Sequence, residues 1–149
     1  MLQPVMEGVA LLHKAGLIHR GICPDNILLP IDGAARLTGY GTLALRTAGS
    51  ELKSQLYPGY AAPEQYGGNG QTTPQTDIYC LGATFHHLTT GRNPASTPFN
   101  FPRITQCRPT LLEETPRDQR DALLGLEMII EKCTEYESQN RYQSCAELK

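Results

Sequence analysis

The chain has little net charge, no long apolar run and no closely spaced cysteine pair, and each absence excludes a class of function. Thirteen basic and fifteen acidic side chains leave a formal charge of −2, which argues against a broad surface for nucleic acid or anionic membrane. No apolar run approaches the roughly 20 residues that a membrane-spanning helix needs. The N-terminus shows no basic region followed by an apolar core, so we expect no secretory signal and a cytoplasmic location.

The cysteines are odd in number and form no C-x-x-C motif, so we interpret them as reduced thiols, some of them in the core. Apart from the adjacent His86 and His87, no Cys/His pair has metal-ligand spacing, and neighbouring residues point to different faces of a helix. We therefore predict no metal site and place both histidines on a helix surface. The cysteines are Cys23, Cys80, Cys107, Cys133 and Cys145.

The hydrophobic pattern predicts one domain that is mainly α-helical, with a small β hairpin. Apolar residues recur at helical spacing over residues 2–14, and Gly16 is a natural end for that helix. A short strand is expected at Ile27–Leu29, ended by Pro30. Asp32 and Gly33 form a strong turn signal, so residues 34–38 are predicted to return as the second strand.

A central helix is predicted next, with Thr76 or Asp77 as its cap and Gly91 after its end. Tyr79 and Ala83 widen its apolar stripe, and a helix that is apolar on most sides is a buried one. The stripe itself consists of Ile78, Leu81, Gly82, Phe85 and Leu88.

The C-terminal part divides by its proline content. Five prolines between residues 92 and 116 forbid a helix of ordinary length there. Helical spacing returns over residues 117–135, and Ser144 is placed to cap a last helix. The apolar face of the 117–135 helix consists of Leu123, Leu126, Ile130 and Cys133, with Ile129 beside them.

A polar turn lies between the first helix and the first strand, at residues 19–26, with the sequence His-Arg-Gly-Ile-Cys-Pro-Asp-Asn. It resembles the catalytic loop of eukaryotic-type serine/threonine protein kinases, H-R-D-x-K-x-x-N. His19, Arg20 and Asn26 match that pattern. Gly21, however, stands where the family has the Asp that accepts the substrate hydroxyl proton, and Cys23 replaces the Lys.

Three further motifs resemble the same family. Gly39-Tyr40-Gly41 stands in place of Asp-Phe-Gly, so the resemblance implies that Gly39 replaces the Asp that binds magnesium. Residues 60–66 resemble the Ala-Pro-Glu element that closes the activation segment, in the form typical of bacterial members. Residues 141–148 resemble the closing R-x-x-S-x-x-E-L element.

The resemblance also implies structural roles. Asp77 would hold the backbone of the catalytic loop. His19 and Arg20 would belong to the residues that maintain the fold. Glu64 and Arg141 would form a buried salt bridge. Leu28 would be the vestigial floor of the adenine pocket.

The resemblance covers only the helical C-terminal lobe, and the family's N-terminal lobe has no match here. Whether the chain is a solitary lobe or a piece of a longer protein stays open. We divide residues 1–149 into a helix (1–16), a catalytic loop, hairpin and degenerate Asp-Phe-Gly motif (17–41), an activation segment (42–66), a central helix (76–91) and a helical end (92–149).

Within the activation segment the hydroxyl residues are interpreted as part of a solvated linker rather than as phosphorylation sites. Residues 67–73 are glycine-rich and are interpreted as a surface loop, because no phosphate-binding arrangement of strand, helix and Lys surrounds them. The hydroxyl residues are Thr42, Thr47, Ser50 and Ser54.

The favoured hypothesis is a pseudokinase lobe that binds a protein partner or a second copy of itself, without ATP or magnesium. Its contact surface would be the face around Leu28 and Tyr40 that the missing lobe covers in whole kinases. The alternative is a fragment of a divergent kinase in which Asp25 or Asp32 supplies a displaced carboxylate. A gene remnant without a selected function is a third reading.

Overall fold

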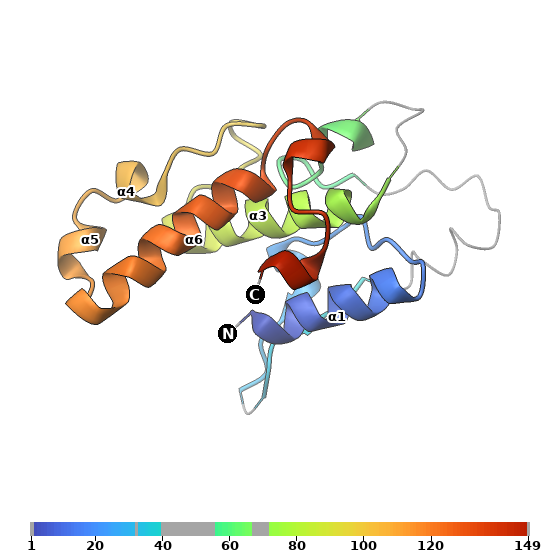
Figure 1. Cartoon of the computed structure of the whole chain (residues 1–149), viewed down its shortest axis with the longest axis horizontal. Coiled ribbons are helices and arrows are strands. Elements are labelled where there is room, and N and C mark those ends of the chain that lie inside the picture. The colour runs from blue at the N-terminus through green and yellow to red at the C-terminus, as the bar shows by residue number, and fades with distance from the viewer. Residues whose placement is uncertain (1, 32, 40–55, 67–71, 149) are drawn as a thin grey trace.

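The computed structural model describes residues 2–31, 33–39, 56–66 and 72–148. It confirms the mainly α-helical fold with a small antiparallel hairpin (Figure 1). The longer helices are α1 (Gln3–Lys14), α3 (Pro74–Thr90) and α6 (Arg120–Cys133), and the strands are β1 (Ile27–Leu28) and β2 (Arg36–Leu37). Short helices are α4 (Ile104–Cys107) and α5 (Leu111–Glu114), with 3-10 turns η1 (Pro24–Asn26), η2 (Pro63–Gln65), η3 (Arg117–Gln119), η4 (Ser138–Asn140) and η5 (Cys145–Leu148).

Helix α1 buries one face and ends where its sequence predicts. Val5 and Val9 are fully buried, and Leu2 and Met6 pack against the same core. The helix stops at Lys14, and Gly16 follows with a φ of +74°, the left-handed conformation common just after a helix. The end of α1 therefore fixes where the polar loop begins.

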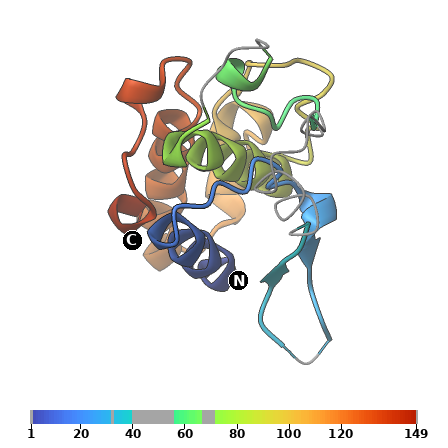
Figure 2. The same ribbon diagram turned by 90° about the vertical axis from the view of Figure 1, so that its right-hand side faces the viewer.

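The hairpin is shorter than its sequence suggests. Ile27 pairs with Leu37 and Leu28 with Arg36, and Pro30 breaks the ladder soon afterwards because it has no N–H to donate. Leu37 points into the core, whereas Leu28 faces outward. Figure 2 shows the tip of the hairpin standing away from the helical body.

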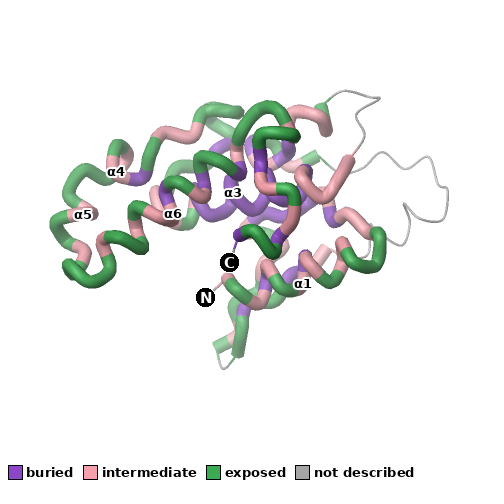
Figure 3. Tube along the Cα trace, viewed as in Figure 1, coloured by how far each residue is buried: buried purple, intermediate pink, exposed green. Residues whose placement is uncertain are grey.

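Helix α3 passes through the centre of the molecule and is buried on all sides from Thr76 to His86 (Figure 3). It begins at Pro74, two residues before the predicted cap at Thr76 or Asp77. Thr73 precedes it, and the Thr73 N–H donates to Thr76 Oγ1 at 3.1 Å. Proline suits the first turn because the N–H it lacks would have no partner there.

Two predictions about the end of α3 are wrong. His86 is buried rather than on the surface, because its Nε2 bonds the Pro102 carbonyl oxygen at 2.7 Å and its ring packs edge-on against Phe101. Leu88, predicted on the apolar stripe, is 52% exposed. Both errors arise because the connection after α3 covers one side of the helix and leaves the other open.

The proline-rich segment after α3 holds only the one-turn helices α4 and α5, as its prolines predict. Helix α6 then returns along α3 (Figure 1). The two helices approach closely at Gly82, where an added Cβ would lie 2.5 Å from the Cβ of Cys133. The predicted last helix forms as the 3-10 turn η5, directly after Ser144.

The main core lies between α1, α3, α6 and the base of the hairpin, and a smaller cluster forms around Tyr79 on the other side of α3. All five cysteines are free thiols, and Cys107 alone among them is partly exposed. In the part of the chain that the structure describes, no helix is both long and apolar enough to cross a membrane.

Several predictions fall outside the described residues and stay predictions. They concern the turn residue Asp32, Tyr40 and Gly41 of the degenerate Asp-Phe-Gly motif, most of the glycine-rich loop, and the hydroxyl residues Thr42, Thr47, Ser50 and Ser54.

Candidate functional site

The loop between α1 and β1 is tied to α3 by one buried carboxylate. Asp77 Oδ2 accepts the backbone N–H of His19 at 2.9 Å, and Asp77 Oδ1 accepts that of Arg20 at 2.8 Å. The Nε2 of His13, from the last turn of α1, lies 2.8 Å from Asp77 Oδ2. A buried carboxylate needs such partners to offset its lost hydration. Asp77 therefore determines the path of the loop backbone.

His19 connects the same loop to the end of the hairpin. Its ring is buried, and its Nε2 lies 2.7 Å from the carbonyl oxygen of Thr38, next to β2. The N–H of Gly21 donates to His19 Nδ1 at 3.2 Å. Together these bonds fit the tautomer with its proton on Nε2. The ring thus holds the loop and the hairpin in register.

Arg20 contributes through its backbone. Its φ of +66° is left-handed, which is uncommon for a residue with a side chain. Its carbonyl oxygen accepts Gln65 Nε2 at 3.0 Å, and Gln65 Oε1 accepts the Ala62 N–H at 2.9 Å. Among the described residues, none hydrogen-bonds the buried Nε of Arg20. The element around Gln65 is therefore fastened directly to the bend of the loop.

Gly21 stands at the position of the family's catalytic Asp, and the space beside it is filled. A Cβ added at Gly21 would lie 2.7 Å from Cε2 and 3.3 Å from Cδ2 of Tyr57. Non-bonded carbon atoms prefer about 3.5–4.0 Å. The Tyr57 ring therefore occupies the room that an aspartate side chain would need, and no such side chain fits unless the ring moves.

Gly39, at the position of the metal-binding Asp, is also crowded, although less tightly than Gly21. Its φ is +89°, and an added Cβ would lie 3.2 Å from Cγ and Nδ2 of Asn26. Side chains rarely tolerate this backbone conformation. Asn26 Nδ2 donates to the Gly21 carbonyl oxygen at 2.6 Å. The family's Asn at this position lies near the metal, whereas Asn26 here bridges the two ends of the loop through its bond to Gly21.

Cys23, Asp25 and Asp32 are the other residues of this region that bear on phosphate transfer. Cys23, at the Lys position, is buried, and burial raises the pKa of its thiol, which stays neutral. Asp25 is exposed in η1, and Asp32 lies outside the described residues. Across residues 2–31, 33–39, 56–66 and 72–148, no group of three His, Cys, Asp or Glu side chains could hold a metal ion.

These residues do not fit the magnesium–ATP complex of the family's active members. That complex requires a carboxylate on the metal and a carboxylate beside the attacking hydroxyl. Gly21 and Gly39 stand at the two positions, and Tyr57 and Asn26 fill the adjoining space. The described loop therefore presents neither of these two carboxylates at the family's positions.

Glu64 and Arg141 lie 77 positions apart in sequence and meet in a bidentate pair. Arg141 Nη1 donates to Glu64 Oε1 at 2.8 Å and Nη2 donates to Oε2 at 3.0 Å. The Arg141 side chain is fully buried and that of Glu64 is 20% exposed. Desolvation alone would raise the pKa of the Glu64 carboxyl, but the hydrogen bonds and charge of Arg141 hold it below its ordinary value.

Arg141 also donates to three backbone carbonyl oxygens, those of Gln75 at 3.1 Å, Glu135 at 2.7 Å and Tyr136 at 2.9 Å. Its guanidinium lies 4.9 Å from the centre of the Tyr79 ring. One side chain therefore joins η2, the start of α3 and the segment after α6.

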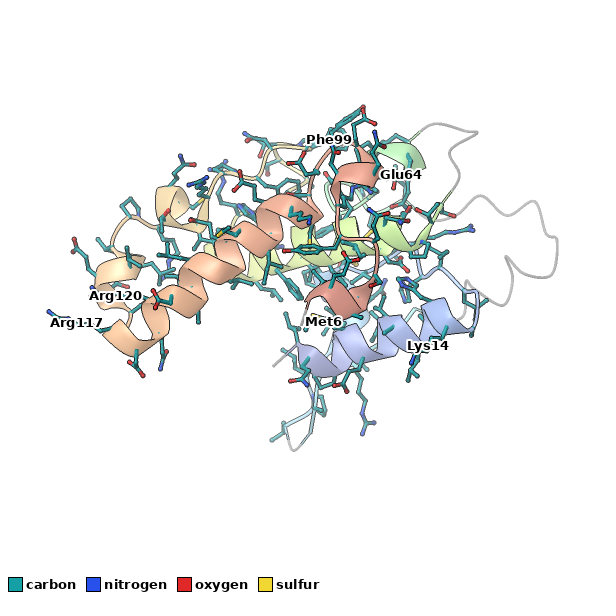
Figure 4. The ribbon with its side chains drawn as sticks, viewed as in Figure 1. Met6, Lys14, Glu64, Phe99, Arg117 and Arg120 are labelled. Atoms are coloured by element: carbon teal, nitrogen blue, oxygen red, sulfur yellow. The ribbon has the colours of Figure 1, made fainter. Side chains whose placement is uncertain are left out.

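The face at the expected adenine floor is open and apolar. Leu28 is 55% exposed and Leu29 is 61% exposed, and Ile31 is fully exposed. A groove of about 550 Å³ lies beside them, between α1, β1, α3 and α6. Met6, labelled on α1 in Figure 4, is among its lining residues. The described part of this face is therefore largely apolar.

Three side chains that shape the site escaped the sequence interpretation. Tyr57 lies in a polar stretch with no periodicity, so no pattern indicated its contact with Gly21. Gln65 belongs to the Ala-Pro-Glu-like motif, which gives no signal for its hydrogen bond to the Arg20 carbonyl oxygen. The position of His13 in the last turn of a helix that leads into the loop is a weak signal for its contact with Asp77.

Comparisons with known proteins agree on the family. The family model described as "Protein kinase domain" matches residues 1–149. The serine/threonine-protein kinase PknL of Mycobacterium tuberculosis is 36% identical over 97 residues, which cover 63% of this chain and 24% of PknL. The probable serine/threonine-protein kinase PknB of Lactococcus lactis is 24% identical over 155 residues, covering 99% of this chain and 24% of PknB.

A solved structure, described as the PpkA-294 apo form, superposes with a TM-score of 0.69 at 26% identity. The match covers 99% of this chain and 50% of that one, so the likeness extends over nearly the whole chain. The chain spans about a quarter of the length of the two curated relatives. On these matches the chain belongs to the protein kinase family, in its eukaryotic-type serine/threonine class known from bacteria.

Proposed function

We propose that this chain is the helical lobe of a catalytically inactive kinase relative and serves as a protein-binding, regulatory module. The observation that carries the proposal is the double replacement by glycine, with Tyr57 closing Gly21 and Asn26 closing Gly39. Catalysis of phosphate transfer consists almost entirely of positioning and electrostatic stabilisation. A loop without its carboxylates and without room for them has lost both contributions.

The test is phosphate transfer by the full-length gene product that contains this chain. We expect no transfer from ATP to itself or to a generic protein substrate, with magnesium or with manganese, and no thermal shift that requires both ATP and metal. Transfer above background that disappears in Asp25→Asn would contradict the proposal, because it would identify a displaced base.

The double variant Gly21→Asp/Gly39→Asp sharpens the same test. It places an aspartate at each of the two positions where the family has one. The added side chains meet Tyr57 and Asn26, so we expect no gain of activity. A gain would mean that the site keeps its catalytic geometry and that Tyr57 and Asn26 do not prevent catalysis.

The binding part of the proposal rests on the apolar face around Leu28, since exposed apolar patches of this kind mark contacts with proteins. We expect self-association or tight binding of another protein domain through this face. Sedimentation at micromolar concentration compares the native chain with Leu28→Glu/Leu29→Glu, and Leu11→Glu on the outside of α1 is the matched control. A native chain that is monomeric and binds no apolar dye contradicts this part.

A further inference from the structure

The hairpin forms an arm that carries apolar side chains away from the body of the molecule. We define the arm as residues 27–31 and 33–37, and Figure 2 shows its tip standing apart from the helices. Leu28 and Leu29 are more than half exposed, and Ile31, near the tip, is fully exposed. A two-stranded hairpin is only marginally stable by itself and gains stability when another element packs on it. The arm therefore presents apolar surface that the described part of its own chain leaves uncovered.

The groove of about 550 Å³ lies at the base of this arm and has an uncharged lining. None of its described lining residues is a Lys, Arg, His, Asp or Glu. A second hollow, of about 380 Å³, lies between α1 and the arm and shares Gln3 and Leu29 with the groove. Each volume falls within the roughly 300–1,000 Å³ of sites that enclose a whole small molecule, so each has room for more than one side chain of a partner.

A projecting apolar arm and an uncharged concave surface thus lie side by side on one chain. The arm forms a wall of both the groove and the hollow, so it cannot also fill them in its own chain. A two-fold rotation, however, places the arm of one copy against the concave surface of the other, and does so twice. An interface with two-fold symmetry requires this kind of self-complementarity.

The surface is large enough for a stable dimer. Ten described residues form the arm, and ten further residues line the groove and the hollow. A standard interface has about 20–30 residues on each side and buries about 800 Å² per partner. Reciprocal contact of both arms uses this whole surface on each copy, which reaches the lower end of that range.

The charges at the rim of this surface are complementary. Glu7 lines the hollow from α1 and is exposed, and its described partner is the side chain of Gln3, 3.1 Å away. Arg36 is the single cation among the described residues of the arm, and it is exposed. No ion pair in the described part of the chain includes Glu7 or Arg36. Complementary charges at a rim select the matching partner and fix its register.

We propose that two copies of this chain bind each other reciprocally, each seating its arm against the groove and hollow of the other. The proposal rests on the binding function proposed above and names the partner as a second copy of the chain. In this dimer Arg36 of each copy pairs with Glu7 of the other, so two ion pairs border one apolar interface.

The first test reverses the two charges one at a time and measures association by sedimentation at micromolar concentration. Glu7→Arg and Arg36→Glu should each weaken dimerisation at least several-fold, because each homodimer then contains two like-charged contacts. An equimolar mixture of the two variants should dimerise about as well as the native chain, because both pairs of the mixed dimer again have opposite charges. Glu113→Arg, an exposed position on α5, is the control and should leave dimerisation unchanged.

Mixing separates a pair between copies from a pair within one chain, because mixing cannot restore a pair within one chain. A mixture that associates no better than either variant alone would overturn the proposal. Native-like association of either single variant would also overturn it, as would an equal loss of association in Glu113→Arg.

The second test changes the end of the arm. Because Ile31 is fully exposed, Ile31→Glu should melt at the native temperature and dimerise at least several-fold more weakly. Leu11→Glu, at a 66% exposed position on the outside of α1, is the matched control and should dimerise as the native chain does. A dimer that survives Ile31→Glu unchanged would overturn the proposal.

Failure of this proposal and failure of the binding function give different results. A native chain that is monomeric but binds an apolar dye, with the dye lost in Leu28→Glu/Leu29→Glu, overturns the reciprocal dimer and supports binding of a different protein by this face. A native chain that is monomeric and binds no apolar dye overturns both.

Discussion

The surroundings of Arg141 and those of Gly21 belong to the same lobe but differ in how their space is used. Around Arg141 every guanidinium nitrogen donates a hydrogen bond, and the acceptors come from four separate residues. Around Gly21 the backbone is equally well bonded, but a tyrosine ring stands where the family carries its reactive carboxylate.

This difference separates two properties that are usually found together in a kinase loop. The position of the loop depends on Asp77 and His19, which reach it from α3 and from within the loop. In the family, phosphate transfer depends on carboxylates at the positions of residues 21 and 39. Since the two sets share no atoms, the loop can keep its path with glycine at both positions.

The largest expected effect comes from breaking the Arg141 region. Arg141→Ala or Glu64→Ala should each cost about 3–5 kcal/mol of unfolding free energy, because each leaves its partner as a lone buried charge. The double variant should lose less than the sum of the two, since no lone charge remains. Denaturant unfolding of the native protein, the two single variants and the double variant measures the three losses of unfolding free energy.

The exposed pair Arg103–Glu131, with side chains 58% and 57% exposed, is the matched control. Arg103→Ala should cost roughly 0–1 kcal/mol. Single variants of Glu64 or Arg141 that stay within about 1 kcal/mol of the native protein would remove the contrast between the buried and the exposed pair.

A smaller effect is expected at Gly21. Gly21→Ala places a methyl group 2.7 Å from the Tyr57 ring, and such overpacking costs about 1–3 kcal/mol. In a Tyr57→Ala background the same change should cost less. Gly125→Ala, in the middle of α6 with no atom within 4 Å of the added group, should instead stabilise by about 0.5–1 kcal/mol. Equal unfolding free energies for both alanine variants would show that the space at Gly21 is open.

The smallest effect is a dependence on pH. The pKa of Glu64 in the folded protein lies below its ordinary value of 4.5. Its contribution to stability is therefore complete above that value and is lost as the pH falls through the lower folded pKa. Urea unfolding of the native protein and of Glu64→Gln between neutral pH and about pH 3 compares the two slopes. Parallel losses in both proteins would mean that Glu64 makes no such contribution.

Local signals predicted the helices and the hairpin well. Gly16 ends α1, and the prolines limit α4 and α5 to single turns. These features depend on backbone constraints that act within a few residues. The start of α3 was misplaced because Thr73 and Thr76 are equally good caps by type, and the preference for Pro74 at the first turn decides between them.

The closure of the candidate site and the burial of His86 could not be predicted. Tyr57 reaches Gly21, and Phe101 reaches His86, from segments without periodic patterns. Such contacts depend on where an irregular segment crosses the fold, which residue spacing does not encode. The sequence identifies the residues of the loop, but it does not predict which side chains pack beside Gly21 and His86.

The complete burial of α3 has a consequence for the timescales of the molecule. From Thr76 to His86 every residue of the helix is buried, and amides of core helices open with free energies close to that of global unfolding. We therefore expect these amides to be among the slowest of the described residues to exchange with solvent. Their exchange rate therefore reports on large-scale unfolding of the same helix whose Asp77 positions the loop.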